Sequence, residues 1–208
     1  MRWKGAVQTE IGTQQDLQNF LRRHKAAWQF ASKASDDYLL ARCGMLNALW
    51  SGFEMATQAS EKLLKAYLLF TDKTGSCNAD NIRKAVSRKS QSLGRTSELG
   101  HDVEACLALA TAVGFVCSAD LQSRLARINS YYSRRYPGEG GPTSLSTGEI
   151  EDVDGAVFQI WDAFKGVNHD YYYTSGLMGP VYGVRLHPRS WRKSQLLFEK
   201  LVWHHDRQ

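Results

Sequence analysis

The most constraining feature of this sequence is a continuous apolar stripe between residues 46 and 68. Its members recur at intervals of three and four residues: Leu46, Leu49, Trp50, Phe53, Ala56, Ser60, Leu63, Leu64, Tyr67 and Leu68. This spacing predicts one long amphipathic helix with a wide apolar face. Such a face needs partners along most of its length, which favours a central place in a helical bundle. Glu61 and Lys65, four residues apart, are expected on the opposite, solvent side.

Four other segments show helical periodicity. The first is predicted to run from Thr13 to about Gly44, with a break near residues 35–36. The others cover 100–114, 118–137 with Ser118 as the cap and Pro137 at the end, and 149–166. Residues 76–100 are polar and basic, and here we expect a short helix around 79–88 followed by a long loop.

These segments predict an all-α fold. Residues 13–167 would form a bundle of about five helices, built on an antiparallel pair of long ones. Residues 168–208 change in character, with tyrosines and glycines followed by a capped amphipathic stretch. They are interpreted as a C-terminal appendage that contains a sixth helix.

Composition narrows the function classes. The net charge of +5 is compatible with an RNA, nucleotide or acidic partner without requiring one. The four cysteines have no zinc-site spacing, and three of them lie on apolar helical faces or at their ends, so buried reduced thiols and a cytoplasmic location are expected. No window is apolar enough to span a membrane. No phosphate-cradling, dinucleotide-binding or metal-binding motif is found, so neither cofactor nor metal is predicted.

Three stretches together resemble the HEPN domain family (higher eukaryotes and prokaryotes nucleotide-binding). They are "ATQASEKLLKAYLLF" (56–70), "LGHDVEACLAL" (99–109) and "YYSRRYPG" (131–138). They are similar to the family's E-K helix, its short H-D helix start and its R-Y-P helix end, in the same order. The resemblance covers roughly residues 15–167.

The resemblance implies a bundle that forms homodimers. It implies membership of a group that contains metal-independent ribonucleases, often toxins or antiviral effectors, and partners of nucleotidyltransferases. The ribonucleases carry R-x4-6-H at the start of the last bundle helix, where the histidine moves a proton and the arginine steadies the phosphate. In this sequence residues 149–165 contain neither residue type. The spacing occurs instead at Arg95 and His101, before the third predicted helix.

Candidate site residues follow from these motifs. For ligand binding they are Tyr131, Arg134, Arg135, Tyr136, Lys62, Lys65 and Asp102, and for catalysis His101, Arg95, Arg134 and Arg135. The arginine pair could bind phosphate or complement the dipole of the helix end. Tyr132 continues the inward stripe, which leaves Tyr131 for solvent or ligand. His101 and Asp102 could serve chemistry or cap a helix, and the basic run 83–89 could contact RNA or only water.

Three functions remain open at this point. The first is an RNA- or nucleotide-binding protein that acts as a dimer, with a partner, in a prokaryotic defence or toxin–antitoxin system. The second is a metal-independent endoribonuclease with a displaced Arg/His site. The third is a protein-interaction module without nucleotide chemistry, docking through its C-terminal appendage.

Overall fold

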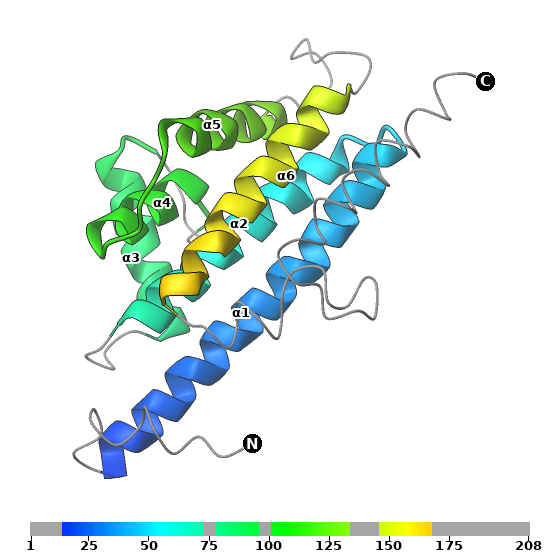
Figure 1. Cartoon of the computed structure of the whole chain (residues 1–208). Coiled ribbons are helices and arrows are strands. Elements are labelled where there is room, and N and C mark those ends of the chain that lie inside the picture. Colours follow the sequence, from blue (N-terminus) through cyan, green and yellow to red (C-terminus); the bar gives the residue numbers. More distant parts are fainter. Residues whose placement is uncertain (1–13, 73–77, 96–100, 134–145, 168–208) are drawn as a thin grey trace.

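The chain forms a helical bundle (Figure 1). The computed structural model describes residues 14–72, 78–95, 101–133 and 146–167, and side chains from Lys25 onward. These ranges contain six α-helices and one 3₁₀ turn, η1 (Ala163–Gly166), and they contain no strand, so the all-α prediction is confirmed. None of the helices in these ranges is long and apolar enough to cross a membrane. The predicted appendage, 168–208, lies outside the described residues.

The two longest helices, α1 (Gln14–Leu46) and α2 (Ser51–Thr71), form an antiparallel pair (Figure 1). Their contact is built from small side chains, since α1 turns Ala27, Ala31, Ala34 and Ala41 inward with no exposed surface. A tight turn joins them, in which the backbone N–H of Leu49 donates to the carbonyl of Gly44 at 2.8 Å. Gly44 and Gly52 face each other at this turn, and a Cβ on Gly44 would lie 3.2 Å from the Gly52 Cα.

The expected break in α1 near residues 35–36 is wrong. The hydroxyl of Ser35 is buried and donates to the carbonyl of Ala31 at 3.2 Å, so it is satisfied within one continuous helix and does not cap a new one. Asp37 pairs with Lys62 on α2. Ser35 and Asp36, the residues that suggested a break, contact Ala31 and Lys33 within α1, and the helix continues through them.

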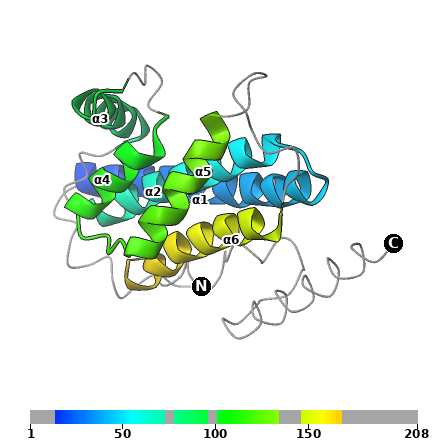
Figure 2. The ribbon, with the colours of Figure 1, turned by 90° about the horizontal axis from the view of Figure 1, so that it is seen from above.

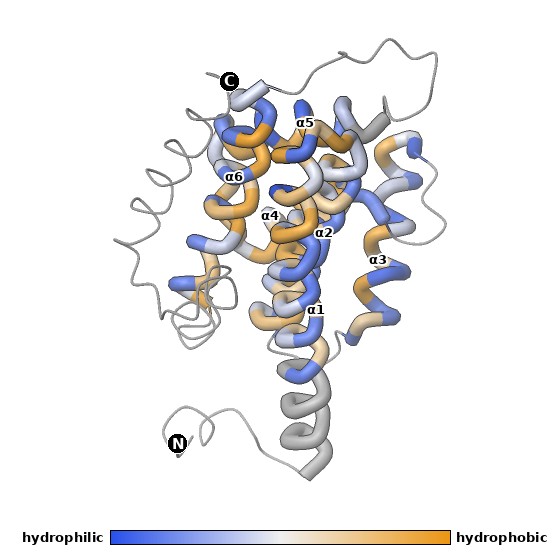
Figure 3. The backbone as a smooth tube through the Cα atoms, turned by 90° about the vertical axis from the view of Figure 1, so that its right-hand side faces the viewer, coloured by the Kyte–Doolittle hydropathy of each residue, from blue (hydrophilic) through white to orange (hydrophobic). Residues whose placement is uncertain are grey.

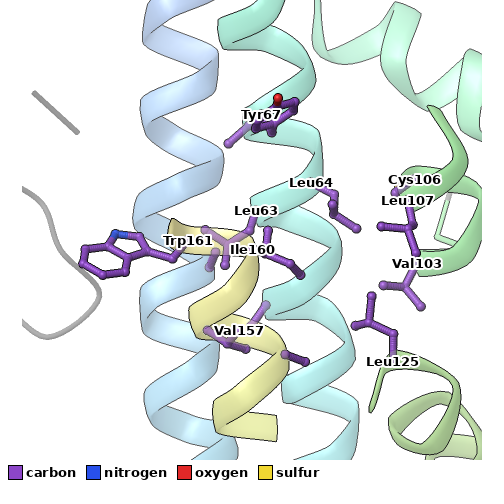
Figure 4. Close-up of a cluster of buried hydrophobic side chains, with 14 of the residues drawn as sticks. Leu63, Leu64, Tyr67, Val103, Cys106, Leu107, Leu125, Val157, Ile160 and Trp161 are labelled. Atoms are coloured by element: carbon purple, nitrogen blue, oxygen red, sulfur yellow. The ribbon is translucent and has the colours of Figure 1, made fainter. Parts of the chain in front are cut away.

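Helix α2 is the centre of the bundle, as its stripe predicted. It packs against α1, α4 (Val103–Ala112), α5 (Ala119–Ser133) and α6 (Thr147–Asp162). Figure 4 shows the core between them: Leu63 of α2 lies beside Ile160 of α6, and Leu64 points toward side chains of α4 and α5. Because neighbours surround α2, thirteen of its residues are buried.

Helix α3 (Ala79–Ser92) is longer than the short helix expected around 79–88. Asn78 caps it by accepting from the Asn81 N–H at 2.9 Å, and it continues through part of the predicted loop. Its main neighbour is α4. Figure 2 and Figure 3 both show α3 at the edge of the bundle, well apart from α6.

The caps of α5 and α6 fix where these helices begin. Ser118 accepts from the Leu121 N–H at 2.9 Å, which confirms it as the predicted cap. The helix predicted from residue 149 begins two residues earlier, because Ser146 and Glu149 form a capping box. The predicted end at Pro137 lies outside the described ranges.

Candidate functional site

A cluster of polar side chains lies where α2, α3 and α4 meet, and Asp102 is at its centre. The Asp102 Oδ1 atom accepts from the N–H groups of Glu104 and Ala105, both at 3.0 Å, so this carboxylate caps α4. Its Oδ2 atom accepts from the buried Ser90 hydroxyl at 2.7 Å. One carboxylate thus stabilises the first turn of α4 and fastens α3 to it.

Arg95 follows α3 and reaches the same place. Its guanidinium lies 3.5 Å from the Asp102 Oδ1 and donates a shorter hydrogen bond to Glu104. The hydrogen bond with Glu104 raises the pKa of Arg95, with a smaller opposing effect of desolvation. Glu104 also accepts from the Asn129 side chain of α5 at 3.3 Å. Arg95 therefore has two carboxylate partners on α4.

The side chain of His101, which directly precedes Asp102, extends toward α2. Its Nδ1 atom lies 3.1 Å from the Glu61 Oε1, while the imidazole side chain remains 62% exposed. Glu61 is buried, and its Oε1 also accepts from the Lys65 ammonium at 2.6 Å. A carboxylate can only accept hydrogen bonds, so this contact places a hydrogen on Nδ1. The Nε2 atom is left to exchange a proton with a ligand.

The structure therefore places Arg95, His101, Asp102 and Lys65, all candidates from the sequence, at this junction. Sequence reasoning missed three members of the cluster: Ser90, Glu104 and Glu61, the last of which is the partner of His101. The spacing of Arg95 and His101 gave a signal for the pair. Glu61 lies forty residues before His101, and no local pattern joins them.

The charge of this cluster limits what it attracts. Glu61, Asp102 and Glu104 supply three carboxylates, against the two cations Lys65 and Arg95. With a neutral imidazole the balance is one negative charge, which does not draw a phosphate by itself. Attraction of an anion must come from neighbouring surface.

That surface is the outer side of α3. The helix carries Arg83, Lys84, Arg88 and Lys89 against one carboxylate, Asp80. Lys84 and Arg88 lie one turn apart, opposite the buried positions 82 and 86, and both are exposed. Within the described ranges, Arg83 alone of the four cations has a carboxylate at ion-pair distance, Asp80 at 3.8 Å. Lys89 is half-buried, so we call the three exposed side chains, Arg83, Lys84 and Arg88, the α3 basic face.

The two lysines of the E-K motif are not where the sequence placed them. Lys65 is buried with Glu61, and Lys62 is half-buried in an ion pair with Asp37. The expectation of an exposed basic surface on α2 is therefore wrong. The physical reason is that α2 has neighbours on more than one side, so even its polar side is covered by α1 and α4.

The proposed site at the end of α5 is described in part. The ring of Tyr131 is half-buried and packs against Phe53 with centroids 4.8 Å apart, so it borders the core and does not stand in solvent as expected. Arg134, Arg135 and Tyr136 lie outside the described residues, as does the side chain of Tyr132.

The cysteines are only partly as predicted. Cys106 is fully buried beneath the cluster, and burial raises the pKa of its thiol, with Glu61 adding to the effect. It is therefore a core side chain and not a nucleophile. Cys117 is half-buried and Cys43 is exposed on α1, so the expectation of a buried thiol is wrong for Cys43. Cys77 lies outside the described residues.

Comparison with known proteins gives no relative for this chain. No family model matches it, and neither a curated protein nor a solved structure matches it. In the part of the chain that the structure describes, no three His, Cys, Asp or Glu side chains are grouped to hold a metal ion. The resemblance to the HEPN family remains a prediction.

Proposed function

We propose that this protein binds RNA through the α3 basic face. The observation that carries the proposal is the exposure of Lys84 and Arg88 on the side of α3 away from α4, without a carboxylate of the described residues at ion-pair distance. Cations in a row on an outer helix attract a phosphate backbone, and the nucleic acid releases condensed counterions when they bind. The choice of RNA over other polyanions rests on the HEPN resemblance, as do a homodimer, a nucleotidyltransferase partner and a role in defence.

The proposal predicts that Lys84→Ala/Arg88→Ala weakens binding of labelled single-stranded RNA about tenfold at low salt, because two exposed ion pairs of up to about 1 kcal/mol each are lost. The slope of log affinity against log salt should fall by about 1.4. Fluorescence anisotropy across a salt series measures both quantities.

The matched control is Lys25→Ala/Lys33→Ala, which removes the same charge from exposed positions on α1. Its affinity should stay close to wild type. Equal losses in the two double variants would show a general charge effect and contradict a site on α3. Absence of RNA binding by the wild-type protein would favour the protein-interaction module.

A second function, metal-independent RNA cleavage, is favoured by the contact between His101 and Glu61. A buried carboxylate that holds an exposed imidazole in one orientation is a common arrangement for proton transfer. In such a reaction the ribose 2′-hydroxyl loses its proton to His101 and attacks phosphorus. The bond to the 5′ oxygen then breaks, and that oxygen takes up a proton. The product is a cyclic phosphate.

If His101 performs this step, His101→Ala should reduce cleavage in EDTA by about 10²-fold or more. Since this side chain is largely exposed, the variant should fold, and its RNA affinity should change little. Gel analysis of labelled RNA and detection of cyclic phosphate ends measure the activity. Cleavage that persists in His101→Ala would exclude this residue as the proton-transfer group.

A further inference from the structure

Helix α3 is held on the bundle by few apolar contacts. It buries three of its fourteen residues, Ile82, Val86 and Ser90, whereas α4 buries five of its ten. One of the three is a serine, so only two apolar side chains fix the helix. Elements with so little buried surface open more readily than the rest of a fold.

Polar contacts supply much of the remaining attachment. Ser90, in the last turn of α3, and Arg95, three residues after its end, contact Asp102 and Glu104 at the start of α4. We call these four residues the latch. Asp102 is nearly buried, with 9% of its side chain exposed, but Arg95 is 41% and Glu104 34% exposed. The latch is therefore accessible from solvent at the Arg95–Glu104 contact.

The chemistry of Arg95 connects the latch to the α3 basic face. A guanidinium donates hydrogen bonds to carboxylate and to phosphate oxygens with the same planar geometry. Arg95 comes three residues after the end of α3, which is the helix that carries the basic face. In the structure its charge is taken up by Asp102 and Glu104 instead.

We propose that the latch is an autoinhibitory contact: Asp102 and Glu104 hold Arg95, and with it α3, so that a nucleic-acid phosphate must displace these carboxylates to use Arg95. The part of this inference that concerns nucleic acid rests on the proposed function. The part that concerns the attachment of α3 does not.

The test is Glu104→Gln, which removes the charge but keeps an oxygen for Asn129. Hydrogen exchange should become about threefold faster for the amides of α3 and stay unchanged for those of α2. The reason is that the variant lacks the Arg95–Glu104 ion pair, one of the contacts that hold α3 on the bundle. The affinity for labelled single-stranded RNA should rise about threefold, because Arg95 becomes available.

Glu151→Gln is the matched control, since Glu151 is an exposed glutamate on α6 and its removal changes the net charge equally. It should leave both quantities near wild type. In the Arg95→Gln background, Glu104→Gln should gain no more affinity than the control does.

The outcomes separate the two proposals. Unchanged exchange in α3 would overturn the latch, whatever the RNA result. Faster exchange with unchanged RNA affinity would overturn the claim that the carboxylates keep Arg95 from binding a phosphate. If the wild-type protein binds no RNA, the proposed function fails, and the exchange data alone decide whether the latch holds α3.

Discussion

Replacing Lys65 with methionine is expected to lower the free energy of unfolding by about 3–5 kcal/mol. The ammonium lies 2.6 Å from the Glu61 carboxylate, and both side chains are about 95% buried. Methionine fills a similar volume, so the loss is not one of packing. It arises because Glu61 keeps its charge in the core with the imidazole of His101 as its main remaining partner. Denaturation by urea, followed by circular dichroism, measures the change.

Two further variants identify the cause. Lys33→Met removes an equal charge from an exposed pair with Asp36, and it should change stability by less than about 1 kcal/mol. Lys65→Met/Glu61→Gln removes both buried charges and should recover much of the loss. If Lys65→Met were no more harmful than Lys33→Met, the Glu61–Lys65 pair would not be buried as the structure has it.

The sequence predicted those parts of the fold that depend on local chemistry. The stripe of α2 predicted its central place, Ser118 was predicted as the cap of α5, and Asp102 was expected to stabilise the first turn of α4. Each of these follows from spacing within one helix or from a single side chain and its own backbone. Interactions of short range in sequence are the ones that a sequence displays.

The errors came from contacts between helices. Periodicity divides one helix into an apolar and a polar side, but it does not say how many neighbours cover it. Glu61 and Lys65 lie on the polar side of α2 and are nevertheless buried. Tyr131 was assigned to solvent or a ligand by the same reasoning, yet its ring packs against Phe53, a residue seventy-eight positions earlier.

The candidate site shows what local spacing predicts and what contacts between helices add. Arg95 and His101 were paired through their spacing alone, while their location before α4 argued against a role. The structure places both residues at one junction. Asp102, the residue after His101, accepts a hydrogen bond from Ser90 of α3, and His101 contacts Glu61 of α2. The outer face of α3 was left open as RNA contact or solvent, and the structure adds that its central cations are exposed. Only the arrangement of α2, α3 and α4 makes these residues neighbours.

Gly52→Ala is expected to destabilise the bundle by about 2 kcal/mol, although alanine is the better helix former. A Cβ at this position would lie 2.5 Å from the Met45 Cγ, 2.8 Å from the Ala41 carbonyl oxygen and 2.9 Å from the Met45 nitrogen. Two of these three atoms are backbone, so no rotamer change relieves them, and α1 and α2 must move apart. For a chain of this size the midpoint of thermal unfolding should fall by about 4–8 °C, as measured by calorimetry.

The matched substitution is Gly148→Ala, in the first turn of α6. A Cβ there would meet only the Ser146 Oγ, at 3.5 Å, which is an ordinary contact. It should therefore leave stability unchanged or raise it by about 0.5–1 kcal/mol through helix propensity. The sign of the difference between the two variants is decisive, because both replace a helical glycine by the same residue. If Gly52→Ala were as well tolerated as Gly148→Ala, α1 and α2 would not approach as closely as their small residues indicate.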